Sequence, residues 1–138
     1  MKVILSGDVH IIVLEKGEYV MESLKKFAKE HNFCGFIIGI GALESPKIGF
    51  FDTNKKIYET KEFIGDYELT SLVGNIGRLE NGEIALHVHI TLGDSNYNIF
   101  GGHLIDGKVA VTLEIFATRT KCFVRRKDDY FGLNLIHE

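Results

Sequence analysis

The fold is decided by IALHVHITLGDSNYNIFGGHLIDGKVAVTLEIFAT, residues 84–118. Ile84–Leu92 and Asn98–Ile105 have the composition of two strands, joined as a hairpin across residues 93–97. Lys108–Thr118 follows after Asp106-Gly107, and Asp-Gly between apolar runs is the strongest short hairpin signal in the chain. The stretch therefore predicts three consecutive antiparallel strands.

The rest of the chain extends this pattern to a sheet with one helix. In Glu18–His31, apolar residues recur at helical spacing, which predicts an amphipathic helix packed on the sheet. Further strands are expected at residues 9–14, 35–40, 47–52, 56–58 and 67–75. No repeat or domain boundary interrupts the pattern. We therefore expect a single α+β domain over residues 1–138, with a mostly antiparallel β-sheet and one packed main helix.

Composition places the chain among ordinary globular proteins, with 45% apolar and 25% charged residues in 138. Its apolar runs are far shorter than the roughly 20 residues of a membrane span, and its first residues lack the apolar core of a signal peptide. The two cysteines, Cys34 and Cys122, both have apolar neighbours, which favours buried free thiols in a reducing compartment. A cytoplasmic location is the expectation.

The charge balance disfavours direct binding to nucleic acid. The net charge is −3. Proteins that bind DNA without a partner are usually basic, because neutralisation of the phosphates supplies most of the affinity. A local basic cluster, followed at once by Asp128 and Asp129, is typical of a solvated face. The cluster consists of Lys121, Arg125, Arg126 and Lys127.

Three histidines form the candidate site. His87 and His89 lie two residues apart on one expected strand, so they point to the same face with Cα atoms about 6.6 Å apart. A loop of three or five residues centred on Asn96 would place His103 opposite His89, on that same face. A loop of two or four residues would turn His103 to the other face, unless a bulge at Gly101-Gly102 corrected the register. The pair Gly101-Gly102 is costly inside a strand and predicts a bulge or a close backbone approach next to His103.

Two interpretations of these histidines stay open. They are either polar side chains on the wet face of a sheet, or a site for a divalent metal, of which zinc suits three imidazoles and an open position. In the second case nearby acids could orient ligands or act as bases. Glu114, on the next expected strand, is the best-placed candidate, and Asp94 lies in the loop. No nucleophile pattern of the Ser-His-Asp or Cys-His kind is present.

The same stretch resembles the PPC domain (plants and prokaryotes conserved). The resemblance is carried by residues 86–94 (LHVHITLGD), 101–104 (GGHL) and 112–115 (TLEI), with residues 39–43 (GIGAL) and 67–76 upstream in the same order. It runs from the first strand to about Gly132, and the pairing of His-x-His with Gly-Gly-His is its most specific part. The resemblance implies an antiparallel sheet with a packed helix, assembled as a homotrimer, with the three histidines near a subunit boundary.

Plant members of this family carry AT-hook segments that contact DNA, while the domain itself mediates assembly, and prokaryotic members are called DNA-binding by association. This chain has no Arg-Gly-Arg-Pro core, and its single proline is Pro46. The resemblance therefore implies a stand-alone, homotrimeric regulatory or assembly module with a divalent-metal site. The alternatives are a metal-dependent hydrolase or lyase acting on a small molecule, with Glu114 as base, and a sensor that binds a small ligand without turnover.

Overall fold

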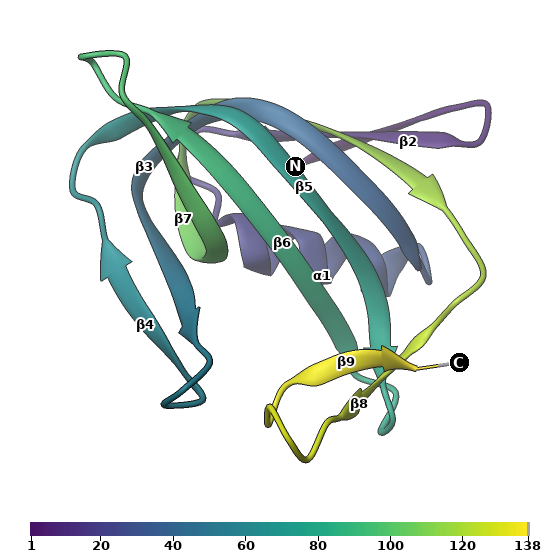
Figure 1. Cartoon of the computed structure of the whole chain (residues 1–138). Coiled ribbons are helices and arrows are strands. Elements are labelled where there is room, and N and C mark those ends of the chain that lie inside the picture. The colour runs from purple at the N-terminus through teal and green to yellow at the C-terminus, as the bar shows by residue number, and fades with distance from the viewer. Residues whose placement is uncertain (138) are drawn as a thin grey trace.

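The computed structural model describes residues 1–137, which form one helix and one nine-stranded sheet (Figure 1). The elements are β1 Lys2–Ser6, β2 Val9–Glu15, α1 Val20–Glu30, β3 Gly35–Asp52, β4 Ile57–Glu62, β5 Asp66–Leu79, β6 Ile84–Gly93, β7 Ile99–Arg119, β8 Val124–Lys127 and β9 Asn134–His137. The expectation of a mostly antiparallel sheet with one helix is confirmed. However, strands make up 66% of the structure, so the protein is more β-rich than an α+β assignment with a main helix implies.

The four longest strands, β3, β5, β6 and β7, pair in a closed ring that surrounds the core. β3 pairs with β5, β5 with β6, β6 with β7, and β7 pairs again with β3, all antiparallel. β1 and β2 continue the sheet from β7, β4 from β3, and β8 and β9 from β5. Figure 1 shows the long strands curving past α1, which contacts β6 and β7. Because strand side chains alternate between faces, every second residue of β6 enters the core, as at Val88, Ile90 and Leu92.

The helix is buried along one stripe, as its spacing predicts. Val20, Leu24 and Phe27 are fully buried against the sheet. Tyr19, which precedes the first turn, makes no capping hydrogen bond with its side chain. Instead, the amide of Met21 donates to the carboxylate of Asp106 at 3.3 Å, so a residue of β7 accepts one of the helix's free amides.

The expected hairpin at Asp106-Gly107 is wrong, because β7 pairs with β3 on both sides of these residues. β7 runs unbroken through both residues, and β3 unites the two strands expected at 35–40 and 47–52. Glu44 pairs with Lys108 and Lys47 pairs with Asp106, so two residues of β3 lie opposite Gly107 alone. This bulge bends the strand. Gly107 lies at the bulge, and the carboxylate of Asp106 accepts a hydrogen bond from the first turn of α1.

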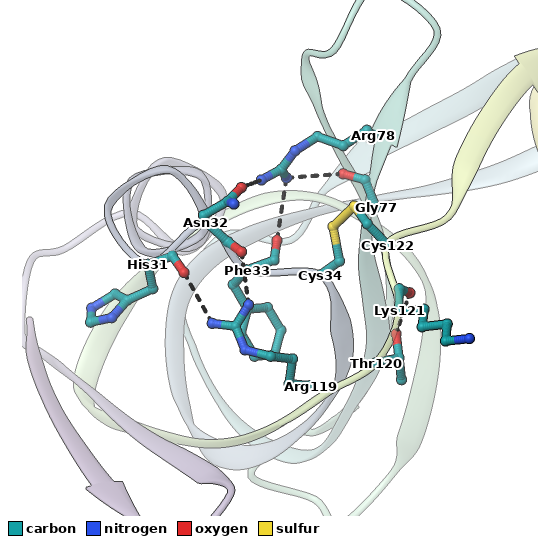
Figure 2. The surroundings of a disulfide bond; sticks show 10 residues. All are labelled: His31, Asn32, Phe33, Cys34, Gly77, Arg78, Arg119, Thr120, Lys121 and Cys122. Carbon is teal, nitrogen blue, oxygen red and sulfur yellow. Dashed lines mark hydrogen bonds between the residues drawn. A yellow bond between two sulfur atoms is a disulfide. The ribbon is translucent and has the colours of Figure 1, made fainter.

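The expectation of two buried free thiols is also wrong. Cys34 is buried but Cys122 is exposed, and a disulfide joins them with their Cα atoms 5.0 Å apart (Figure 2). The cause is the pairing of β3 with β7, because Gly35 lies opposite Arg119 and the amide of Thr120 donates to the carbonyl of Cys34 at 3.0 Å. Residues 88 positions apart in the sequence thus become neighbours.

Two arginines hold the segment between α1 and the disulfide (Figure 2). Arg119 donates to the carbonyls of His31 at 3.0 Å and Asn32 at 2.8 Å. Arg78 donates to the carbonyl of Phe33 at 3.3 Å and to the side chain of Asn32 at 3.2 Å. The carbonyl of His31 belongs to the C-cap of α1, where a cation complements the helix dipole, and the other acceptors lie in the segment that follows the helix.

In the part of the chain that the structure describes, no helix is long and apolar enough to cross a membrane.

Candidate metal centre

The hairpin of β6 and β7 brings His103 opposite His89. Gly93 pairs with Ile99 and His89 with His103, so the loop has five residues, 94–98, centred on Asn96. The loop thus has the odd length that puts His103 on the face of His89, and the pairing of these two strands contains no bulge. Asp94 is occupied inside the loop, where its carboxylate accepts from the amides of Asn96 at 2.8 Å and Asn98 at 2.9 Å.

The three imidazoles converge on one point. The ring centroids of His87 and His89 are 5.0 Å apart, and His103 lies 5.3 Å from the first and 5.4 Å from the second. The Nε2 atoms of His87 and His89 are 3.2 Å apart. One nitrogen from each ring falls within 4.8 Å of the others, an arrangement that could hold a metal ion.

Glycine at 101 and 102 lets the backbones pack closely beside His103. A Cβ at Gly101 would lie 2.2 Å from the carbonyl oxygen of Ile90, and one at Gly102 would lie 2.9 Å from that of Gly49. Both distances are far below van der Waals contact. The expected close backbone approach is confirmed, and it fixes β7 between β6 and β3 where it carries His103.

Burial keeps the imidazoles of His87 and His103 neutral. Loss of hydration is the largest cause, and together with the neighbouring His87, His89 and Arg125 it lowers the pKa of His103 to about 4. Burial, then the charge of Arg125, also lowers the pKa of His87. The ring of Tyr58, from β4, lies against His103 with centroids 4.8 Å apart and contributes to this burial. Neutral imidazole is the form that binds a metal.

Arg125 belongs to the site, which the sequence did not predict. Three residues of the basic cluster are exposed as expected, but Arg125 is only 7% exposed. Its Nη2 donates to the side-chain oxygen of Asn75 at 2.8 Å and to Nδ1 of His87 at 3.3 Å, and its Nη1 donates to the carbonyl of Asn134 at 3.0 Å. The cause is the parallel pairing of β8 with β5, which sets Arg125 beside Leu79.

A cavity of about 340 Å³ opens beside these groups. Its polar wall consists of Lys25, Tyr58, His87, His103, Arg125 and Asn134. Its apolar wall comes from the ends of β5 and β6 and from the segment that leads into β9: Leu79, Ile84, Leu86, Leu133 and Leu135.

Glu114 is not brought to the histidines. It lies on β7 opposite Val13 and Ile40, eleven residues beyond His103, which is on the order of 30 Å of extended strand. Its side chain is exposed and lines a different cavity, together with Ile40 and Thr112. Within residues 1–137, the histidine cluster includes no carboxylate.

Comparison with known proteins agrees with the resemblance seen in the sequence. The model of the Plants and Prokaryotes Conserved (PCC) domain matches residues 1–121. No curated protein matches the chain. Among solved structures, a plant- and prokaryote-conserved (PPC) protein of Pyrococcus horikoshii is 33% identical, with a TM-score of 0.85 and 98% of each chain covered.

Two further structures are similar over nearly the whole chain. A protein of Bacteroides thetaiotaomicron, provisionally named DNA binding, is 29% identical with a TM-score of 0.94, covering 99% of this chain and 96% of its own. A metal-containing protein of Archaeoglobus fulgidus is 30% identical with a TM-score of 0.87, and each chain is covered completely, at 100%. The matched length and the shared fold lead to one assignment: this chain belongs to the Plants and Prokaryotes Conserved (PCC) domain family.

Proposed function

We propose that this chain is a stand-alone PPC-type module that binds one divalent metal ion through His87, His89 and His103. The convergence of three imidazole nitrogens within 4.8 Å is the observation that carries the proposal. Zinc is the preferred ion, because it accepts three nitrogen ligands and leaves a fourth position open. The metal-containing relative from Archaeoglobus fulgidus supports the idea that this fold accommodates metal.

The chemistry of the donors fits the ion. A neutral imidazole has one unprotonated nitrogen that can bind a metal, and the lowered pKa values of His87 and His103 keep these rings neutral at pH 7. Such an ion would act as a Lewis acid at its open position. Nothing among the described residues favours the hydrolase or lyase alternative, because the acid expected to serve as base, Glu114, lines a separate cavity.

A second part of the proposal is assembly as a homotrimer through the outer face of the sheet. Cross-strand pairing puts His103, His89, Val73, Ile38 and Phe116 in one row, and paired residues share a face. Val73, Ile38 and Phe116 are 45%, 45% and 46% exposed, although all are large and apolar. Contiguous exposed apolar residues are typical of protein interfaces. The row would set the histidines beside the subunit boundary.

The role that we propose is regulatory or assembly-related, and associated with DNA through partners. A cytoplasmic location stays a prediction, and the Cys34–Cys122 disulfide removes the argument from free thiols that led to it. Relatives of this fold bear a provisional DNA-binding name, which motivates the association. The net charge of −3 argues that this chain does not grip the phosphate backbone unaided. A small ligand bound at the cavity would then act as a signal to the assembly.

A zinc titration of untagged, EDTA-treated protein tests the metal site. We expect about one ion bound per chain in the wild type and at least tenfold weaker binding in His89→Ala. His137→Ala, which removes an exposed histidine of β9, is the matched control and should bind as the wild type does. Equal affinities in all three proteins would contradict the proposed ligands.

A further inference from the structure

Arg125 carries a charge that the described chain leaves unpaired. The side chain is 93% buried, and no carboxylate of residues 1–137 lies within ion-pair distance of it. Its three hydrogen bonds go to neutral acceptors on Asn75, His87 and Asn134, and its Nε has no partner. A buried cation without a counter-charge is unfavourable, so this environment is built for an anion.

Neighbouring residues hold the guanidinium in place. Asn75 lies on β5 opposite His87, and Asn134 is the first residue of β9. Hydrogen bonds from the two strands that flank β8 therefore hold Arg125. The disulfide at Cys122 anchors the chain three residues before it. Arg125 lies beyond residues 1–121, the part of the chain that the family model matches.

The walls of the cavity beside Arg125 indicate what kind of anion would fit there. Arg125 and Lys25 line it, and no aspartate or glutamate of residues 1–137 does. Most of the remaining wall is apolar, from Leu79, Ile84, Leu133 and Leu135 among others. Its volume of about 340 Å³ lies in the range of small-molecule sites. An anionic head and a compact apolar body match these walls.

We propose that this cavity binds a small organic acid, whose carboxylate pairs with Arg125 beside the histidines and whose apolar body contacts Leu79, Leu133 and Leu135. A guanidinium suits a carboxylate because its N–H groups form charge-assisted hydrogen bonds, and the Nε–H and one Nη1–H of Arg125 are not used by the described residues. The site needs no metal, so the proposal stands or falls separately from the metal centre.

Isovalerate is the probe, titrated into EDTA-treated protein and followed by calorimetry. We expect one saturable site per chain, with isovalerate binding about tenfold or more tightly than acetate because its extra carbons are buried. Isovaleramide, which has the same shape without the charge, should show no saturable binding. Arg125→Lys should weaken isovalerate about tenfold by losing the planar fork. Arg126→Lys, in an exposed arginine paired with Glu80, should leave affinity unchanged.

Three results would overturn the proposal. They are no saturable isovalerate binding by the wild type, equal affinities in the Arg125→Lys and Arg126→Lys proteins, or equal binding of isovalerate and inorganic phosphate. If circular dichroism shows that Arg125→Lys does not fold, an NMR experiment on the wild type tests the proposal instead. Its Arg125 Nε–H resonance in a ¹⁵N NMR spectrum should move on addition of isovalerate and not of isovaleramide. A stationary resonance would refute carboxylate binding at this residue.

Discussion

Nη2 of Arg125 lies 3.3 Å from Nδ1 of His87 and joins the C-terminal strands to the histidine cluster. A guanidinium only donates hydrogen bonds, so Nδ1 of His87 accepts this one. The neutral ring then carries its proton on Nε2, the atom 3.2 Å from Nε2 of His89. Metal coordination by Nε2 would move that proton to Nδ1, where it would face the guanidinium. The charge of Arg125 therefore disfavours metal binding at His87, unless an anion pairs with the guanidinium or the arginine side chain moves away from the ring.

Replacement of Arg125 by glutamine should tighten zinc binding by about tenfold, because groups behind a ligating histidine tune affinity on this scale. Glutamine removes a cation beside His87 and offers an oxygen that accepts the Nδ1 proton. Calorimetric titration of the EDTA-treated protein measures the change, with Arg126→Gln as the control at an exposed neighbour. Weaker zinc binding in Arg125→Gln alone would show that the arginine supports the metal.

Ile38→Asp should convert the proposed trimer to monomers. Ile38 is 45% exposed and lies between Val73 and Phe116 in the apolar row, so a buried carboxylate there would be unpaired at the interface. Sedimentation velocity reports the assembly state. Tyr97→Asp, at a 91% exposed loop position, is the control and should leave the state unchanged. A monomeric wild type, or a trimeric Ile38→Asp protein, would rule out this interface.

Cys34→Ser should lower the free energy of unfolding by about 2–5 kcal/mol, because the disulfide closes a long loop and restricts the unfolded chain. The two cysteines are 88 residues apart in the sequence. Urea unfolding of the wild type and Cys34→Ser measures the difference, and reduced wild type should resemble the variant. Detection of two free thiols in the denatured, unreduced protein would contradict the bond.

His10 should make the fold sensitive to mild acid. Its ring is 8% exposed, among Phe27, Phe33 and His31, and burial lowers its pKa below the ordinary 6.5, with Arg119 and His31 adding repulsion. Below pH 6.5 the unfolded chain takes up a proton at His10 that the folded chain resists. Stability should therefore fall as the pH falls below that value.

The melting temperature at pH 7.5 and at pH 5.5 measures this effect. His10→Leu should reduce the loss on acidification, because it removes the group that is protonated on unfolding. His137→Leu, at an exposed position, should lose as much stability as the wild type. An acid-induced loss that is the same in all three proteins would assign the effect to other groups.

The sequence narrowed the register of the histidines to two alternatives, because the face of His103 depends on whether the loop length is odd or even. A five-residue loop centred on Asn96 pairs His89 with His103, and alternation puts His87 on the same face. The glycines at 101 and 102 were also informative, since a close backbone approach excludes any side chain there. Both arguments use residues near one another in the sequence.

The remaining features depend on contacts that the local sequence does not encode. Asp106-Gly107 has the composition of a turn, but the carboxylate of Asp106 accepts a hydrogen bond from the amide of Met21, a residue that is distant in the sequence. Arg125 and Arg126 look alike in the sequence, and only the pairing of β8 with β5 buries the first and exposes the second. The disulfide likewise follows from the pairing of β3 with β7.

The most direct test of the metal centre is elemental analysis of protein purified without a histidine tag. We expect about one transition-metal ion per chain in the wild type and none in a His87→Ala/His89→Ala variant that still folds, since zinc needs these imidazoles. Absence of metal from both proteins, or its retention in the folded variant, would contradict a metal site at these histidines.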